Sequence, residues 1–263
     1  VFRGEGQGRF GAGTKRFRTN SSFEFYKPAI KLADVDGNGS LDILTSNGRR
    51  NTIEILLVAG RAGSGPAFAA APEVSLTPGS SFYTFGVGDF DADGHADLVT
   101  TFDSTSTRVE FRKGVGNGRF QEPSGGAVVR AGARLAAVAD LNADGRPDVV
   151  ISHADSGWMS ILLSDGRGSF THAPQSPRDL GLQTYGVVVT DVNRDGRPDI
   201  VATTVNSRVR PYESRVAVLL GDSLQSAAGS PFPVGHGAYQ LAVGDINEDG
   251  KPDVVTSSFE SDS

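Results

Sequence analysis

Oxygen-bearing side chains recur in five nine-residue segments of this sequence. Asp stands at positions 1 and 9 of every segment, Asp or Asn at positions 3 and 5, and Gly at position 6. Such a cluster of carboxylate and amide oxygens, with a Gly that allows a sharp bend, is the kind of ligand set that a hard cation such as Ca²⁺ takes. The segments, called loops 1 to 5 below, are 34–42, 89–97, 140–148, 191–199 and 245–253.

Each loop is predicted to bind one Ca²⁺, which gives about five ions per chain. The predicted side-chain ligands are Asp34, Asp36, Asn38, Asp42, Asp89, Asp91, Asp93, Asp97, Asp140, Asn142, Asp144, Asp148, Asp191, Asn193, Asp195, Asp199, Asp245, Asn247, Asp249 and Asp253. Position 7 is predicted to offer its backbone carbonyl, and it is occupied by Ser40, His95, Arg146, Arg197 and Lys251.

Two other interpretations of the loops are weaker. An EF-hand loop starts in the same way, but it needs a Glu at position 12 and a helix on each side. Position 12 holds no acidic residue here, and short apolar runs typical of strands flank the loops. Asp, Asn and Gly also form turns without a metal. That explanation suits one loop but not five copies, whose acidic groups would repel one another without a cation.

Short β-strands are the elements that must position these loops. The loops begin 51 to 55 residues apart, with an apolar run before each loop and another after it. A third run follows in four units, at 53–57, 109–111, 159–163 and 216–220, and a weaker fourth precedes the next loop. Four short strands in about 50 residues match the blade of a β-propeller. Helical repeats do not fit, because the runs are short, β-branched and broken by Gly.

We therefore predict an all-β fold, in which residues 1–263 form a single five-bladed β-propeller of four-stranded antiparallel blades. The fifth unit stops before a third strand, and residues 1–10 read like the missing third strand and turn. The two chain ends are expected to share one blade and close the ring, which favours a monomer. A piece cut from a longer array of repeats would show the same pattern.

Composition and charge exclude several classes of function. The formal net charge of −6 argues against nucleic acid as a partner, because nucleic-acid binding relies on clusters of Lys and Arg. About half of the acidic residues are predicted ligands, so the charge mostly reflects the metal sites. The absence of Cys excludes disulfides and thiol catalysis. No apolar run is long enough for a membrane-spanning helix, so no membrane insertion is expected.

The loops and their surroundings resemble the FG-GAP and VCBS repeats, calcium-binding propeller blades of integrin α-subunits and fungal lectins. Loops 3 to 5 match the motif fully, whereas Leu41 and Ala96 stand where the family prefers Pro. Phe85-Gly86 and Tyr185-Gly186 resemble the Phe-Gly part of the motif. The resemblance implies a propeller fold and a secreted or cell-surface location. Family propellers commonly have seven blades, so five units are a departure.

Aromatic and basic residues at recurrent positions are the candidate ligand contacts. Six residues before loops 2 to 5 stand Tyr83, Arg134, Tyr185 and Tyr239, and Trp158 is expected in a turn between the second and third strands. These side chains can line the mouth of a central channel and stack on sugars, although packing between blades is the more common role of such residues.

The leading functional hypothesis is an extracellular binding module that recognises a glycan or a protein surface, with structural metals and no enzymatic activity. Two alternatives remain open. One is a polysaccharide lyase, for which Arg134, Tyr185 and Tyr239 are the only repeat-related catalytic set. The other is a purely structural segment of a larger secreted protein.

Overall fold

The computed structural model describes residues 4–6, 9–10, 29–47, 50–59, 67–76, 82–102, 107–153, 156–221 and 223–259. Every regular element among them is a β-strand, and all the paired strands in its sheets run antiparallel. The predicted all-β class is confirmed. None of these residues forms a helix that could cross a membrane.

Four sheets share the expected plan of four antiparallel strands in sequence order, three of them with a short extra strand beside the third. Their strands are β3 (Ile30–Ala33), β4 (Asp42–Asn47), β5 (Thr52–Ala59), β6 (Ala67–Ala70) and β7 (Val74–Ser75) in blade 1; β8 (Phe82–Gly88), β9 (Asp97–Phe102), β10 (Arg108–Arg112) and β11 (Gly125–Val128) in blade 2; β12 (Ala133–Ala139), β13 (Asp148–His153), β14 (Trp158–Ser164), β15 (Phe170–His172) and β16 (Arg178–Asp179) in blade 3; β17 (Gln183–Thr190), β18 (Asp199–Asn206), β19 (Glu213–Leu220), β20 (Gln225–Ser226) and β21 (Phe232–Val234) in blade 4. Each predicted third strand lies within β5, β10, β14 or β19.

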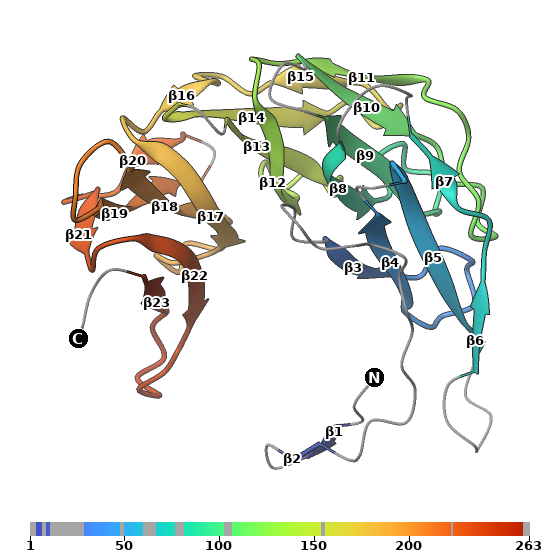
Figure 1. The fold of residues 1–263 in the computed structure, drawn as a ribbon, viewed down its shortest axis with the longest axis horizontal. Helices are drawn as coiled ribbons and strands as arrows, with labels where there is room; N and C mark the ends of the chain where they lie inside the picture. Colours follow the sequence, from blue (N-terminus) through green and yellow to red (C-terminus); the bar gives the residue numbers. More distant parts are fainter. Residues whose placement is uncertain are drawn as a thin grey trace.

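The blades stand side by side in an arc that is open at one place (Figure 1). Blade 5 consists of β22 (Ala238–Gly244) and β23 (Asp253–Ser258), which pair only with each other in the described part of the chain. The N-terminal strands β1 (Gly4–Gly6) and β2 (Arg9–Phe10) likewise form a separate two-stranded sheet. The predicted pairing of the two chain ends in one blade is therefore not found, and ring closure with five complete blades stays a prediction.

The hydrophobic core lies between consecutive blades, because alternate residues of a strand face opposite sides of its sheet. In β13, Val149 and Ile151 join a buried cluster with Phe90 of the preceding blade, whereas Val150 joins another with Ile200 of the following blade. The central strands are buried on both faces and read as continuous apolar runs. The blades are thus held together in sequence order by the two faces of each sheet.

Position 2 of each loop links the loop to this core. Val35, Phe90 and Leu141 occupy it in loops 1 to 3 and are at most 5 % exposed. Phe90 makes an edge-on ring contact with Phe170 of blade 3, with ring centroids 5.4 Å apart. Ile246, the equivalent residue of loop 5, is 62 % exposed, because no described blade packs beyond it.

Truncation of Phe90 tests this arrangement. We expect Phe90→Ala to lower the free energy of unfolding by about 3–5 kcal/mol, since it removes a fully buried ring. The matched control is Val128→Ala, at a position that is 72 % exposed, which should change the free energy of unfolding by less than about 0.5 kcal/mol. Urea unfolding followed by fluorescence measures both. A loss below about 1 kcal/mol for Phe90→Ala contradicts the interblade core.

Candidate functional site

All five loops are built around the carboxylate at position 1. Its two oxygens accept hydrogen bonds from the backbone N–H groups of positions 5 and 6, at 3.1–3.2 Å and 2.7–2.9 Å. The side chain at position 5 in turn accepts from the N–H of position 7, at 2.8–2.9 Å. These short-range bonds wrap the chain around a common centre. The wrapping follows from the positions of Asp and Asn in the motif.

The Asp at position 9 anchors each loop to its blade. One of its oxygens accepts from the N–H of position 2 at 2.9 Å in every loop. In loops 1 to 4 the other oxygen accepts from an N–H at or next to the end of the third strand, at 2.7–2.9 Å; the donors are Val58, Gly114, Ser164 and Gly221. Asp42, Asp97, Asp148 and Asp199 are fully buried.

Two left-handed residues give each loop its bend. The Gly at position 6 has φ between 80° and 87° in all five loops, as the motif predicts. Position 4 is left-handed as well, although it holds Gly only in loop 1. In the other loops it is Ala92, Ala143, Arg194 or Glu248, with φ between 58° and 64°. The sequence gives no sign of this second bend, because residue types vary at the position.

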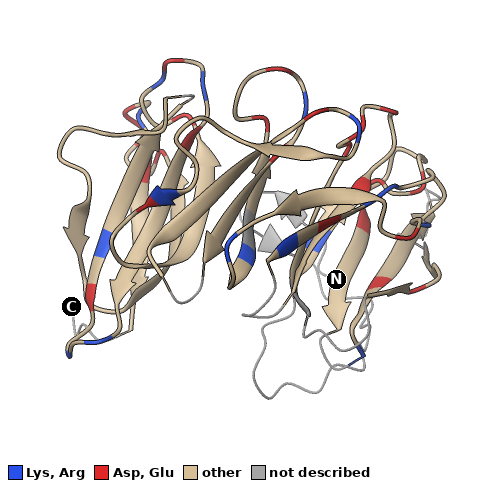
Figure 2. Cartoon of the chain, turned by 90° about the horizontal axis from the view of Figure 1, so that it is seen from above, with Lys and Arg blue, Asp and Glu red and all other residues tan. Residues whose placement is uncertain are grey.

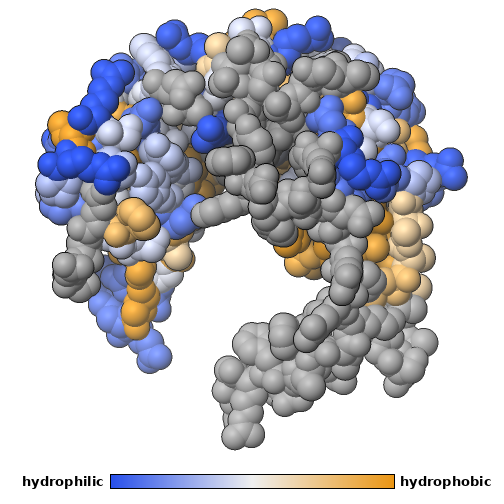
Figure 3. Space-filling view, in the orientation of Figure 1, coloured by the Kyte–Doolittle hydropathy of each residue, from blue (hydrophilic) through white to orange (hydrophobic). Residues whose placement is uncertain are grey.

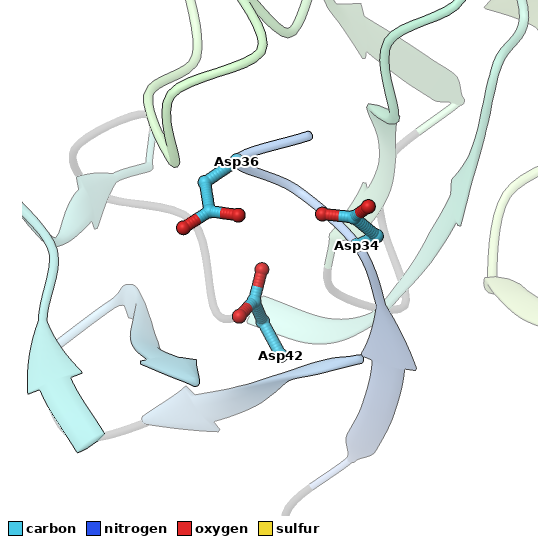
Figure 4. A group of neighbouring side chains, drawn as sticks. All are labelled: Asp34, Asp36 and Asp42. Atoms are coloured by element: carbon cyan, nitrogen blue, oxygen red, sulfur yellow. The ribbon is translucent and has the colours of Figure 1, made fainter. Parts of the chain in front are cut away.

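The carboxylates of the first two loops converge. The side chains of Asp34, Asp36 and Asp42 point toward one another (Figure 4), with one oxygen of each within 4.8 Å of the others. Asp89, Asp91 and Asp97 form the same group in loop 2. The oxygens of loop 1 fit a hard divalent cation, for which Asp34, Asp36, Asn38 and Asp42 would be the side-chain ligands. The carboxylates at positions 1, 3 and 9 are thus brought together in loops 1 and 2.

Burial affects the charge of the position 9 side chain. Burial, as the largest cause, raises the pKa of Asp97 to about 6, and the neighbouring Asp91 carboxylate raises it further against the hydrogen bonds that lower it. Burial also raises the pKa of Asp148, with contributions from Asp144 and Asp140. A bound cation favours the charged form of such groups, so these carboxylates have a physical reason to take one.

Loop 2 differs from the others by an ammonium group. Lys113 Nζ donates a hydrogen bond to Asp91 Oδ2 and lies 2.6 Å from Asp93 Oδ2. Hydrogen bonding to Lys113, the largest cause, lowers the pKa of Asp93. This contact is not predictable from the motif, because Lys113 lies beyond the loop and reaches it only through the pairing of β9 with β10.

The candidate ligand contacts lie on the opposite face from the metal loops. The loops join the first and second strands of each blade, so the turns between the second and third strands lie at the other end of the sheets. Figure 2 shows acidic residues in the loops along the upper edge of the molecule. Trp158 is not in a turn as predicted, but is the first residue of β14. The Arg130 guanidinium lies 4.6 Å from its ring centroid.

Tyr185 and Tyr239 are brought together across blades 4 and 5. Their ring centroids are 4.7 Å apart with the rings nearly perpendicular, and Tyr212 lies 6.3 Å from Tyr239. This geometry is packing between blades. Arg134 lies in β12 of blade 3, and its backbone carbonyl accepts from Ser152 Oγ at 3.5 Å. Tyr83 lies in β8, but its side chain is outside the described part of the structure.

A cavity of about 280 Å³ lies on the same face, between blades 3 and 4. Its lining includes Gln183, Asn206 and Arg208 beside the backbone of Gly157 and Gly181. Tyr185 Oη donates to Gln183 Oε1 at 3.4 Å, which connects the aromatic cluster to the cavity wall. These cavity residues are not among the ligand contacts predicted from the sequence.

The Gly at position 6 gives a direct test of the loop bend. A Cβ built on Gly145 meets no atom within 4 Å, so Gly145→Ala adds only the cost of a left-handed Ala at φ 83°. We expect the free energy of unfolding in chelator to fall by about 1 kcal/mol. The reverse change at the second bend, Ala143→Gly, should not lower it. Equal stability of Gly145→Ala and the parent chain in urea titrations contradicts the bend.

Comparisons with known proteins agree with this architecture. Mouse integrin alpha-IIb is 29 % identical over 154 residues, which are 47 % of this chain and 14 % of the integrin. The chain thus spans a small part of that relative's length. Among solved structures, an Agrocybe aegerita lectin, described as specifically recognising non-reducing terminal N-acetylglucosamine, has a TM-score of 0.57 at 17 % identity. The match covers 97 % of this chain and 67 % of the lectin.

A second solved structure, BBS1N in complex with ARL6DN, has a TM-score of 0.50 at 13 % identity, covering 88 % of this chain and 76 % of BBS1N. The FG-GAP-like repeat matches residues 34–100, 89–151 and 140–202, and the FG-GAP repeat matches residues 237–259. Each matched segment contains at least one of the acidic loops, and together they cover most of the chain. The chain therefore belongs to the FG-GAP repeat family and forms a propeller of such repeats.

Proposed function

We propose that this chain is an extracellular, calcium-stabilised propeller that binds a glycan or protein ligand on the face opposite its metal loops. The observation that carries the proposal is the separation of the two faces. Acidic loops recur on one side of every blade, whereas the cavity, the tyrosine cluster and Trp158 lie at the other ends of the strands. The loops recur in every blade, which suits a structural role. A ligand site needs to occur only once in the molecule.

Calcium is the cation proposed for the loops. Carboxylate, amide and carbonyl oxygens in a flexible turn favour it over Zn²⁺, which prefers nitrogen and sulfur ligands. His153 does not offer a zinc ligand, because it is buried and hydrogen-bonded to Ala131 O and Ser160 Oγ, and burial lowers its pKa. The number of ions, about five from the motif count, stays a prediction.

Calcium removal tests the role of the metal. We expect the melting temperature of the chelator-treated chain to rise by roughly 10 °C or more when millimolar Ca²⁺ is restored, because ions that bind only the folded state stabilise it. Asp144→Ala, at position 5 of loop 3, should lose part of this gain. Glu122→Ala, whose side chain is 95 % exposed outside the loops, should keep all of it. An equal melting temperature with and without Ca²⁺ would refute the metal assignment.

A glycan is the first ligand to test. The cavity offers amide, hydroxyl and guanidinium groups that hydrogen-bond to sugar hydroxyls, and aromatic rings lie near it. The lectin neighbour, which recognises terminal N-acetylglucosamine, supports this class of ligand, and the integrin relative makes a protein ligand the second class.

The proposal includes no enzymatic activity. Tyr185 and Tyr239, two members of the only catalytic set that the repeats suggested, contact each other edge to face as packing residues do. Arg134 lies in the inner strand of another blade. A polysaccharide lyase remains the alternative, and a purely structural segment of a larger secreted protein is the second alternative.

Closure of the ring is also proposed rather than observed. Apolar side chains are exposed at both ends of the arc, with Ile30 and Leu32 of blade 1 at 64 % and 60 %, and Ile246 and Val255 of blade 5 at 62 % and 49 %. Figure 3 shows orange atoms on both sides of the gap. Covering these faces would be favourable, and a closed monomer or a second copy would each do so. The mass in solution distinguishes the two.

Ligand binding is tested with a panel of immobilised oligosaccharides, including chains that end in N-acetylglucosamine. We expect calcium-loaded protein to retain at least one class of glycan, and Asn206→Ala in the cavity to weaken this binding at least tenfold, about 1.4 kcal/mol. Arg119→Ala, outside the cavity lining, should leave it unchanged. Retention of no glycan and no protein probe by folded material contradicts the binding function, and release of unsaturated products from acidic polysaccharides favours the lyase.

A further inference from the structure

Lys113 occupies a position that is apolar in the other complete blades. The residue after it, Gly114, donates its N–H to Asp97 Oδ1, and Val58, Ser164 and Gly221 make the same bond in blades 1, 3 and 4. This shared bond aligns the blades residue by residue. The residues that stand at the position of Lys113 are therefore Leu57, Leu163 and Leu220.

Loop 2 also has an unusual set of oxygen ligands. It carries Asp at positions 1, 3, 5 and 9, whereas every other loop replaces one of these with Asn. In loops 1, 3 and 4 the Asn amide N–H donates to the Asp two residues away, at 2.9–3.1 Å. Loop 2 has no amide, and Lys113 makes the equivalent link between Asp91 and Asp93.

These two links differ in how they respond to a metal ion. A side-chain amide can rotate and present its oxygen as a ligand, so the Asn of loops 1, 3 and 4 is compatible with Ca²⁺. An ammonium has no acceptor atom and keeps its positive charge. It would have to leave both carboxylates before they could bind an ion, and a cation beside it would be repelled. Loop 2 therefore does not fit Ca²⁺ as the other loops do.

Two basic residues within the loops show a different contact. Arg146 and Lys251, at position 7 of loops 3 and 5, approach only the Asp at position 5, at 3.5 Å and 4.0 Å. Their side chains are 41 % and 74 % exposed, against 32 % for Lys113. Lys113 differs from these two residues because it contacts two carboxylates of one loop.

We propose that the ammonium of Lys113 takes the place of Ca²⁺ in loop 2, so that blade 2 is stabilised without a metal while the other loops depend on one. The inference rests on calcium binding by the other loops. It makes the repeats unequal, with one blade whose loop keeps its structure when calcium is scarce.

The test compares the calcium content of the parent chain with that of Lys113→Leu, which restores the residue of the other blades. Full-length protein is dialysed against a fixed free Ca²⁺ concentration, and bound calcium is measured by atomic emission. We expect about four ions per parent chain and about one more in the variant. Arg119→Leu, which removes a positive charge at an exposed position outside the loops, should leave the count unchanged.

Thermal unfolding in chelator gives a readout independent of metal content. Without Ca²⁺, Lys113→Leu should melt below the parent chain, because the four carboxylates of loop 2 lose the positive charge of the ammonium. Its melting temperature should rise more than that of the parent when Ca²⁺ is added. Lys113→Met, with an unbranched side chain of similar length, should behave in the same way and replaces the Leu variant if that variant does not fold.

The outcomes separate this inference from the broader metal proposal. Equal, non-zero calcium contents in the parent and both Lys113 variants overturn the inference but leave calcium binding intact. In that case an ion shares the loop with Lys113, and Asp91 Oδ1, which is buried without a hydrogen-bond partner, is the atom available to it. If no chain binds calcium, the metal proposal fails, and this inference fails with it.

Discussion

The fold depends on one buried carboxylate in each complete blade. The Asp at position 9 accepts one hydrogen bond from its own loop and another from the third-strand region, so it holds three segments of the blade in register. A carboxylate taken out of water is costly unless its oxygens find donors, and these backbone N–H groups supply them. Ser164, one of these donors, also donates its hydroxyl to the Phe90 carbonyl of blade 2 at 2.9 Å, so the anchor extends to the preceding blade.

The same anchor determines where chemistry can occur. The loop before the buried Asp must turn sharply, which brings the oxygen ligands together at one end of the sheets. The turns between the second and third strands lie at the other end. The turns vary in length and sequence without disturbing the loops. This division of the two faces explains why the repeat is regular at the metal side and irregular around the cavity.

Much of this arrangement could be predicted from the sequence, because it rests on local patterns. The spacing of Asp and Gly predicts the loops, and short apolar runs predict the strands; residues 159–163, for example, lie within β14. What could not be predicted depends on pairing between distant residues or on backbone angles without a residue preference. Lys113 reaches loop 2 only through the register of β9 and β10. The bend at Ala143 has no signature, and the partner of β23 is not fixed by any local motif.

The placement of the core between blades has a consequence for how the molecule comes apart. Each blade contacts only its neighbours. The stability of the arc is therefore a sum of the stabilities of the blades and of the interfaces between neighbouring blades, as in other repeat proteins. A blade in the middle is held on both faces, whereas a blade at the gap is held on one. Blades 1 and 5, in which Leu32 and Val255 are 60 % and 49 % exposed, are then the segments that open most readily. The ends of the arc therefore limit how cooperatively it unfolds.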